Sequence, residues 1–293
     1  MNIVFFGSSK YVLPVIEVLK NNFNLKLVVT TEKNPTDPVI NYCSKNNIEC
    51  ISTLRIDNNI KSKLKTLDAK IAVVASFGVI IPQDVLDLFP KGILNIHPSL
   101  LPKYRGTTPV QTAILNNDKK TGVSIMLLDK EMDHGPILEQ QTINLSDTET
   151  SDTLYTQLFN IGSQMLTKLI PLFLEDKIVL TAQNHENASF TKPLTRDSGY
   201  LKINDKYQIP NLKFINKLEI RNWKLEIARA TRALYPWPGV WTKYKLSKNG
   251  NEKIIKLLPE NRIQVEGKKP MTIKDFINGY ENAKEFLAKI GLN

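Results

Sequence analysis

Three polar side chains have the types and spacing of an acyl-transfer site: Asn95, His97 and Asp133. Asn95 and His97 are two residues apart in the apolar run that follows Gly92, and side chains at that spacing on a strand point to the same side. Asp133 precedes His-Gly-Pro, a turn sequence that holds a carboxylate at a loop tip. An amide, an imidazole and a carboxylate, without a Ser or Cys nucleophile elbow, suit the transfer of an activated acyl group to an amine. The amine is itself the nucleophile, so the protein supplies position, an oxyanion donor and a proton acceptor.

A histidine near the end of a strand is more often structural than catalytic. A second segment favours a catalytic role for His97, because Met126–Leu138 also has the pattern of a strand followed by a turn. In an open α/β sheet, ligands bind where the strands end, and both segments bring polar groups to such ends.

The order of apolar segments predicts the elements that position these residues. Strands and helices alternate, which predicts an α/β fold with a mostly parallel, Rossmann-like sheet covered on both faces. Only Gly7 follows the first strand, so a G-x-G-x-x-G dinucleotide site is disfavoured. The expected strands are Asn2–Gly7, Leu25–Thr30, Ile71–Ala75, the run from Ile93, Thr121–Leu128 and Ile137–Asn144, and the expected helices are Val12–Leu19, Val39–Asn46, Gln83–Leu88, Pro109–Asn116 and a long helix within Thr148–Leu174.

The composition is that of a globular protein, with 42% hydrophobic and 23% charged residues among 293. Two cysteines, Cys43 and Cys50, have no metal-ligand spacing, which favours a reducing cytoplasm and no metal. The first residues read as strand, turn and helix rather than as a signal peptide. No apolar run approaches the length of a membrane span, so we expect no membrane partner.

The excess of positive over negative charge lies entirely in the last third of the chain. Residues 1–199 contain 20 Lys and Arg and 20 Asp and Glu, whereas residues 200–293 contain 19 and 9, which accounts for the whole net charge of +10. Such a surface is either a solvated, lysine-rich face or a site that attracts a polyanion such as RNA. The candidate phosphate contacts are Arg105, Lys224, Arg229, Arg232, Lys268 and Lys269.

A polar, turn-rich stretch divides the chain. We expect a catalytic domain over 1–184, a linker over 185–205 and a smaller, basic, β-rich domain over 206–293. The second domain contains a helix over Asn222–Ala233, a rigid Tyr-Pro-Trp-Pro-Gly corner around Trp237, and a final helix near Ile273–Ile290. We expect Trp237 to have a structural role at the junction of the domains. Two short β-like runs are Ile254–Leu258 and Arg262–Val265.

The sequence N-I-H-P-S-L-L-P-x-Y-R-G, followed by M-D-x-G-P-I-L, resembles the folate-dependent formyltransferase family. Within it the chain is most similar to the branch that formylates methionyl-initiator tRNA. The resemblance implies transfer of the formyl group of 10-formyltetrahydrofolate to the α-amine of that tRNA's methionine, in support of translation initiation. It implies that Asn95 and His97 donate to the oxyanion, that Asp133 orients His97 and accepts the proton, and that the protein is a monomer.

The resemblance also implies residues that contact the folate. In the family, the loop after the Asn and His residues and an aromatic-Gly turn form the pterin pocket. The sequence leaves open whether Arg105 holds this loop or meets a phosphate. The implied folate contacts are Ser99, Leu100, Leu101, Pro102, Phe77, Gly78 and Ile80.

Two departures from the family pattern keep other functions open. The loop Thr31–Pro38 is short and has one basic residue, Lys33, where tRNA-acting members carry a basic insertion. The stretch between Pro238 and Lys269 is short for the family's oligonucleotide-binding barrel, so we expect a reduced barrel. The alternatives are a formyltransferase for a small amine, such as an amino-sugar nucleotide or glycinamide ribonucleotide, and a folate- or RNA-binding module without catalysis.

Overall fold

The computed structural model describes residues 1–203 and 223–292. The expected start of the second domain at 206 and the expected first helical residue, Asn222, lie outside the described residues. The chain divides into two compact units. The first contains Met1–Pro109, Lys120–Asn144 and Tyr155–Thr191, and the second contains Val110–Lys119, Leu145–Leu154 and Lys192–Asn293.

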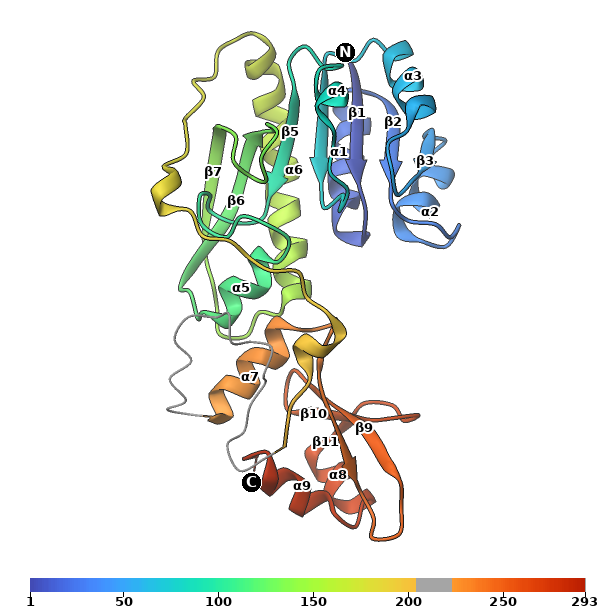
Figure 1. Ribbon diagram of the computed structural model, residues 1–293, viewed down its shortest axis with the longest axis vertical. Coiled ribbons are helices and arrows are strands. Elements are labelled where there is room, and N and C mark those ends of the chain that lie inside the picture. Colours follow the sequence, from blue (N-terminus) through green and yellow to red (C-terminus); the bar gives the residue numbers. More distant parts are fainter. Residues whose placement is uncertain (204–222, 293) are drawn as a thin grey trace. The chain divides into compact units, whose positions relative to one another are not determined.

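The first unit is built on a seven-stranded sheet with the order β3-β2-β1-β4-β5-β6-β7 (Figure 1). The five strands from β3 to β5 are parallel to their neighbours, whereas β5–β6 and β6–β7 are antiparallel. The expected mostly parallel α/β sheet is therefore confirmed. The strands are β1 (Asn2–Gly7), β2 (Asn24–Thr30), β3 (Cys50–Ser52), β4 (Ile71–Ala75), β5 (Ile93–His97), β6 (Lys120–Leu127) and β7 (Ile137–Asn144).

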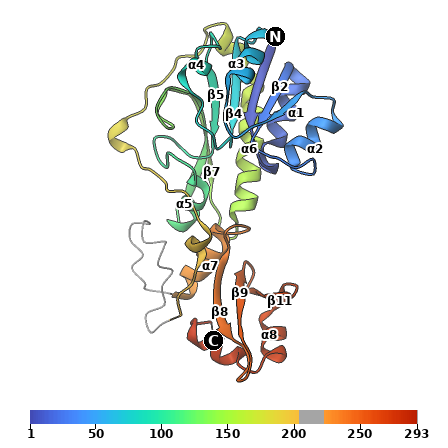
Figure 2. The ribbon, with the colours of Figure 1, turned by 45° about the vertical axis from the view of Figure 1, so that its right-hand side comes forward.

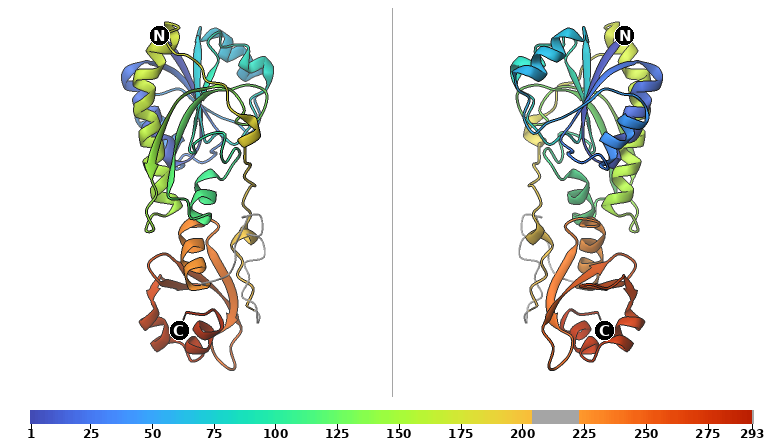
Figure 3. Two further views of the ribbon diagram at one scale, coloured as in Figure 1. Left: turned by 90° about the vertical axis from the view of Figure 1, so that its left-hand side faces the viewer. Right: turned by 90° about the vertical axis from the view of Figure 1, so that its right-hand side faces the viewer.

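Helices cover both faces of this sheet, as Figure 3 shows edge-on. One face carries α1, α2 and α6, and the other carries α3 and α4. At Gly162 of α6, an added Cβ would lie 2.6 Å from Ile96 Cγ2, so glycine lets α6 lie directly against β5 between the two polar positions of that strand. The helices of this unit are α1 (Leu13–Asn22), α2 (Pro38–Lys45), α3 (Asn58–Thr66), α4 (Gln83–Leu86) and α6 (Ser151–Leu174) from Tyr155 onward, with short 3₁₀ turns η1 (Lys10–Val12) and η2 (His185–Asn187). The helix α5 (Pro109–Leu115) belongs to the second unit from Val110 onward.

The central strands are buried on both faces, which explains their unbroken apolar runs. All five residues of β4 are buried, as a strand between two helical layers requires. The core beneath α3 and α4 contains Val4, Phe6 and Val74 from the sheet and Leu64 and Val85 from the helices. This packing fixes the ends of β4 and β5, where the candidate site lies.

The second unit contains a four-stranded antiparallel sheet with the order β11-β10-β9-β8, and α8 lies against β10 and β11 (Figure 2). The expected β-rich C-terminal domain is confirmed. Among the described residues no pairing joins β8 to β11, so the described strands form an open sheet. Its elements are η3 (Arg196–Gly199), α7 (Trp223–Ala233), β8 (Val240–Lys245), β9 (Glu252–Leu258), β10 (Arg262–Val265), β11 (Met271–Thr272), α8 (Ile273–Gly279) and α9 (Ala283–Lys289).

The expectation of one final helix near Ile273–Ile290 was wrong. Thr272 caps α8 by accepting a hydrogen bond from the Asp275 N–H at 3.1 Å, and α8 ends at Gly279, a residue with low helix propensity. Tyr280 is extended, and α9 begins three residues later. No described helix in either unit has the length and apolar character needed to cross a membrane.

Candidate active site

The three candidate catalytic side chains meet at one carboxylate. Asn95 and His97 are the third and the last residue of β5, and Asp133 lies in the loop between β6 and β7. The Asn95 Nδ2 donates to Asp133 Oδ1 at 3.2 Å, and His97 Nδ1 lies 3.5 Å from the same oxygen. The other oxygen, Oδ2, accepts the Gly106 N–H at 2.7 Å. The structure therefore brings the predicted trio together.

A main-chain carbonyl determines the tautomer of His97. The Nε2 of His97 lies 2.9 Å from the carbonyl oxygen of Tyr104, which can only accept, so Nε2 carries a hydrogen and donates. Nδ1 then faces the Asp133 carboxylate. In neutral imidazole this nitrogen is a lone-pair acceptor, so a hydrogen bond to Oδ1 forms only when one additional proton occupies the pair. The pair is arranged to receive one proton.

The Asp133 loop is held in an unusual backbone conformation. Asp133 has a positive φ of 51°, which aspartate tolerates better than most residues. The Nε2 of Gln183 donates to the main-chain oxygens of Asp133, at 2.9 Å, and Gly135, at 2.7 Å. At Gly135 an added Cβ would lie 2.0 Å from the Leu127 oxygen, so only glycine allows the loop to approach β6 this closely.

A cavity of about 460 Å³ opens beside this trio, where β4 and β5 end. Its lining includes Phe77, Gly78 and Ile80, three of the predicted folate contacts. Ile80 is 89% exposed at the edge of the cavity, whereas Phe77 is buried against Phe6. An apolar cavity with a few convergent polar groups is the usual form of a ligand site. The other lining residues include Pro98, Gly106, Leu128, Asp129, Lys130, Glu131, Met132, Tyr155 and Phe159.

The other predicted folate contacts, Ser99, Leu100, Leu101 and Pro102, do not line this cavity. They form a loop that is held by hydrogen bonds to Lys103 and to Ser124 of β6. Ser99 is buried and its hydroxyl donates to the Lys103 oxygen at 2.6 Å, while Leu101 packs in the core. Ser124 of β6 accepts from the Leu101 N–H at 3.1 Å. Their side chains thus shape the loop, and a role in folate binding stays a prediction.

Arg105 lies inside the protein. It is 3% exposed, and its guanidinium donates to Gln183 Oε1 at 2.7 and 3.2 Å and to His185 Nδ1 at 2.8 Å. Of the two roles that the sequence leaves open for Arg105, this geometry supports holding the loop rather than meeting a phosphate. Arg105 and Asp133 share Gln183 as a partner, so the two loops are joined by one side chain.

The remaining basic candidates belong to the second unit. Lys224, Lys268 and Lys269 are exposed, and Arg229 is half-buried. Arg232 donates from Nη1 to the Glu149 oxygen at 2.9 Å, and burial lowers the pKa of its guanidinium. These five residues belong to the second unit, whereas the catalytic trio belongs to the first.

Sequence reasoning missed several residues of the site. Gln183 falls in a polar stretch without periodicity, and its role depends on partners 48 to 78 residues away. Tyr155 and Phe159 lie within the predicted long helix but were not named as site candidates, and they line the cavity. Among the described residues no group of three or more His, Cys, Asp or Glu side chains has the arrangement of a metal site.

Comparison with known proteins relates this site to formyl transfer. A family model described as "Formyl transferase" matches residues 1–170, which contain the whole catalytic trio. A methionyl-tRNA formyltransferase of Thermodesulfovibrio yellowstonii is 31% identical over 94% of this chain and 95% of its own. That of Roseiflexus sp. is 35% identical over 84% of this chain and 74% of its own.

Solved structures share the fold at lower identity. A 4-N formyltransferase from Francisella tularensis superposes with a TM-score of 0.64 and 18% identity, over 88% of this chain and 98% of its own. An N-formyltransferase from Helicobacter canadensis, solved with folinic acid and dTDP-3-aminofucose, gives a TM-score of 0.60 and 20% identity over 90% and 94% of the two chains. These similarities extend over both units of the fold.

Proposed function

This chain belongs to the formyl transferase family, and we propose that it transfers the formyl group of 10-formyltetrahydrofolate to the α-amino group of methionyl-initiator tRNA. The relatives named methionyl-tRNA formyltransferase match it over most of their length, which supports the tRNA substrate. The observation that carries the chemistry is the convergence of Asn95 and His97 on Asp133 beside an open cavity. The product supports the initiation of translation.

In this proposal the neutral amine attacks the formyl carbon, and a tetrahedral intermediate forms with negative charge on the formyl oxygen. Asn95 has two amide hydrogens and uses one on Asp133, so the other is available to donate to the oxyanion. His97 donates only from Nδ1, because Nε2 is engaged with Tyr104. Its donation therefore requires the doubly protonated ring. Asn95 is held as a donor before the reaction begins, which is how such sites lower the barrier, whereas His97 becomes a donor when its ring gains the second proton.

The proton from the amine goes to Asp133, directly or through water. The amine nitrogen forms a bond to the formyl carbon and loses this proton, while the bond from that carbon to N10 of the folate breaks and N10 accepts a proton. Asp133 and His97 Nδ1 face each other across 3.5 Å, so the pair can take the proton and return it to the leaving nitrogen. The substrate amine supplies the nucleophile, and no covalent enzyme intermediate is needed.

We place 10-formyltetrahydrofolate in the 460 Å³ cavity, with the pterin near Phe77, Gly78 and Ile80 and the formyl-bearing nitrogen toward Asn95. The loop Ser99–Pro102 follows β5, the strand that carries Asn95 and His97. The proposal includes no metal. Tyr155 and Phe159 add apolar surface that an aromatic cofactor ring can contact.

The basic C-terminal part carries the tRNA in this proposal. We retain the division into a catalytic domain over 1–184, a linker over 185–205 and a tRNA-binding domain over 206–293, and we propose a monomer. Lys224, Arg229, Arg232, Lys268 and Lys269 are proposed phosphate contacts, Arg232 being already engaged with Glu149. We also propose a cytoplasmic location, which a tRNA substrate supports.

Formyl transfer to a small amine is the second candidate, and the short loop after β2 favours it. This loop folds on itself: Asp37 Oδ2 accepts the N–H groups of Lys33 and Asn34 at 2.9 Å, and Glu32 Oε2 accepts that of Val39 at 2.7 Å. It offers only Lys33 to a nucleic acid.

The test measures transfer of radiolabelled formyl from 10-formyltetrahydrofolate to methionyl-initiator tRNA, with Asn95→Ala as the inactive control. Elongator methionyl-tRNA and an amino-sugar nucleotide serve as competing acceptors. The proposal requires transfer to initiator tRNA with a KM that rises steeply with salt, because phosphate contacts release counterions. Transfer to the sugar nucleotide alone would move the assignment to the small-amine branch.

A further inference from the structure

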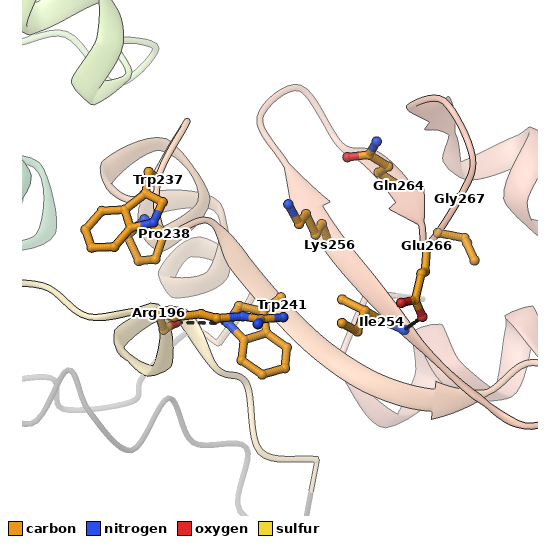
Figure 4. A pocket seen from close by; sticks show the side chains of 10 residues that line it. Arg196, Trp237, Pro238, Trp241, Ile254, Lys256, Gln264, Glu266 and Gly267 are labelled. Atoms are coloured by element: carbon orange, nitrogen blue, oxygen red, sulfur yellow. Dashed lines mark hydrogen bonds between the residues drawn. The ribbon is translucent and has the colours of Figure 1, made fainter. Parts of the chain in front are cut away.

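The second unit contains a separate cavity of about 370 Å³, built on η3 and strands β8, β9 and β10. Two tryptophans, Trp237 and Trp241, and two cations, Arg196 and Lys256, line it (Figure 4). None of these residues takes part in the candidate active site described above. A concave surface that combines aromatic faces with cations suits a ligand that is both flat and anionic.

The two tryptophans have different environments. Trp241 is 9% exposed, its Nε1 donates to the Arg196 oxygen at 3.0 Å, and the Arg196 guanidinium lies 5.1 Å from its ring centroid. This indole is structural. Trp237 is 57% exposed, so packing in the core does not explain why this residue is a tryptophan. It stands between two prolines in a corner that Gly239 closes with a φ of 75°, so its backbone is held rigidly.

The polar groups of the cavity select the kind of ligand. Lys256 and Arg196 supply two positive charges, and Glu266 supplies one negative charge near Ile254, whose N–H it accepts at 3.2 Å. The net charge of these three side chains is therefore +1, which suits one phosphate better than a pyrophosphate. Gln264 donates from Nε2 to the Lys268 oxygen at 3.0 Å. This bond fixes the orientation of the whole side-chain amide, including its carbonyl oxygen. An aromatic face, a cation and an oriented amide are what a single nucleotide contacts.

We propose that this cavity holds one unpaired nucleotide of an RNA strand, with its base stacked on Trp237 and its phosphate toward Lys256 and Arg196. The identity of the RNA, the methionyl-tRNA substrate, rests on the function proposed above. An RNA occupant is favoured over a free nucleotide by the long-range charge, since residues 200–293 contain 19 basic and 9 acidic residues. Unpaired bases in loops and single-stranded ends expose the faces that such stacking needs.

The test uses the full chain and four variants. Trp237→Leu keeps apolar bulk but removes the aromatic face, Trp237→Phe retains a ring, and Lys256→Ala removes the proposed phosphate contact. Lys253→Ala is the matched control, because Lys253 is an exposed lysine of the same strand that does not line the cavity. Circular dichroism and thermal unfolding show that each variant is folded.

The measured quantities are the Kd for methionyl-tRNA and the kcat and KM for formyl transfer. Trp237→Leu is expected to raise Kd and KM by roughly 5- to 100-fold, the usual effect of losing one base stack, with kcat within about twofold of wild type. Trp237→Phe is expected to recover most of the affinity. Lys256→Ala is expected to lower the slope of log Kd against log salt by about one, the effect of one phosphate contact, and more than Lys253→Ala does.

A short unstructured RNA and free AMP separate the possible results. Loss of oligoadenylate binding in Trp237→Leu supports the cavity even if wild type fails to formylate tRNA, in which case only the proposed function is wrong. Normal tRNA and oligoadenylate binding by a folded Trp237→Leu overturns the inference while leaving formyl transfer intact. Saturable AMP binding that depends on Trp237, with no effect on RNA affinity, also overturns it, because the occupant is then a free nucleotide.

Discussion

The side-chain amide of Gln183 donates to the main-chain carbonyl of Asp133 at 2.9 Å, across 50 residues of sequence. The same amide group accepts two hydrogen bonds from Arg105. Gln183 therefore holds the loop of the proton acceptor and the loop that follows His97, without lining the cavity itself. Its role is that of a positioning residue.

Replacing Gln183 tests this role. Gln183→Leu removes four hydrogen bonds and leaves buried partners unsatisfied, which costs about 1–3 kcal/mol per group. We expect a lower melting temperature and a loss of kcat of about tenfold or more, because displacement of a catalytic group by about 1 Å can cost a hundredfold. The KM for folate should change less than kcat. Gln164→Leu, at an exposed position of α6, is the control and should leave both quantities near wild type.

Asp133→Asn separates proton transfer from loop structure. Asparagine tolerates the positive φ of 51° and can still accept the Gly106 N–H, so the fold should be retained. The amide has no capacity to take the amine proton, and we expect formyl transfer to fall by at least about a hundredfold. The measurement is single-turnover formyl transfer beside circular dichroism. Retained activity would remove Asp133 from its proposed role; Asp84→Asn, an exposed carboxylate paired with Lys61, is the control.

Asn95→Ala removes the proposed oxyanion donor. Asn95 also donates to Asp133 at 3.2 Å, so the substitution leaves the carboxylate with one fewer partner. We expect a loss of about 10²–10³ in kcat with a small effect on the binding of folate, the usual cost of one oxyanion donor. Isothermal titration with a non-transferable folate analogue measures the second quantity. Equal losses in folate affinity and in rate would instead make Asn95 a binding residue.

Gly135→Ala tests how closely the Asp133 loop must approach β6. An added Cβ would lie 2.0 Å from the Leu127 oxygen, a main-chain atom that cannot move without disturbing the pairing of β6. We expect a loss of stability of about 1–3 kcal/mol and a fall in kcat. Gly279→Ala is the matched control, since nothing lies within 4 Å of its Cβ position, and it should be neutral or slightly stabilising. Both are measured by urea unfolding, and an unchanged Gly135→Ala would mean that the loop has room to shift.

The elements with long apolar runs could be predicted from the sequence, and those defined by distant contacts could not. Ile71–Ala75 and Ile137–Asn144 were predicted with the bounds that the structure gives. The strand Cys50–Ser52 was missed because three residues carry too little pattern. The helix Asn58–Thr66 was missed because only Ile60 and Leu64 of its nine residues are buried.

For the site, spacing along a strand predicted the positions of Asn95 and His97, and a turn sequence predicted that of Asp133. The contacts of Arg105 could not be predicted in the same way. An arginine in a loop usually lies at the surface, and its burial here depends on Gln183 and His185, which come about 80 residues later. The basic residues were assigned to nucleic-acid binding from their residue type alone, and the residue type does not indicate whether a side chain is buried.

The meander of β5, β6 and β7 has a consequence for the order in which the site forms during synthesis. Asn95, His97 and Asp133 lie on or between consecutive antiparallel strands, so they can meet as soon as the chain has emerged to Asn144. The amide that fixes the Asp133 loop arrives only with Gln183. In a nascent chain the three reactive side chains would thus come close together before the Asp133 loop is fixed in place. We expect catalytic activity to appear late, when residues 183–191 pack against the rest of the unit.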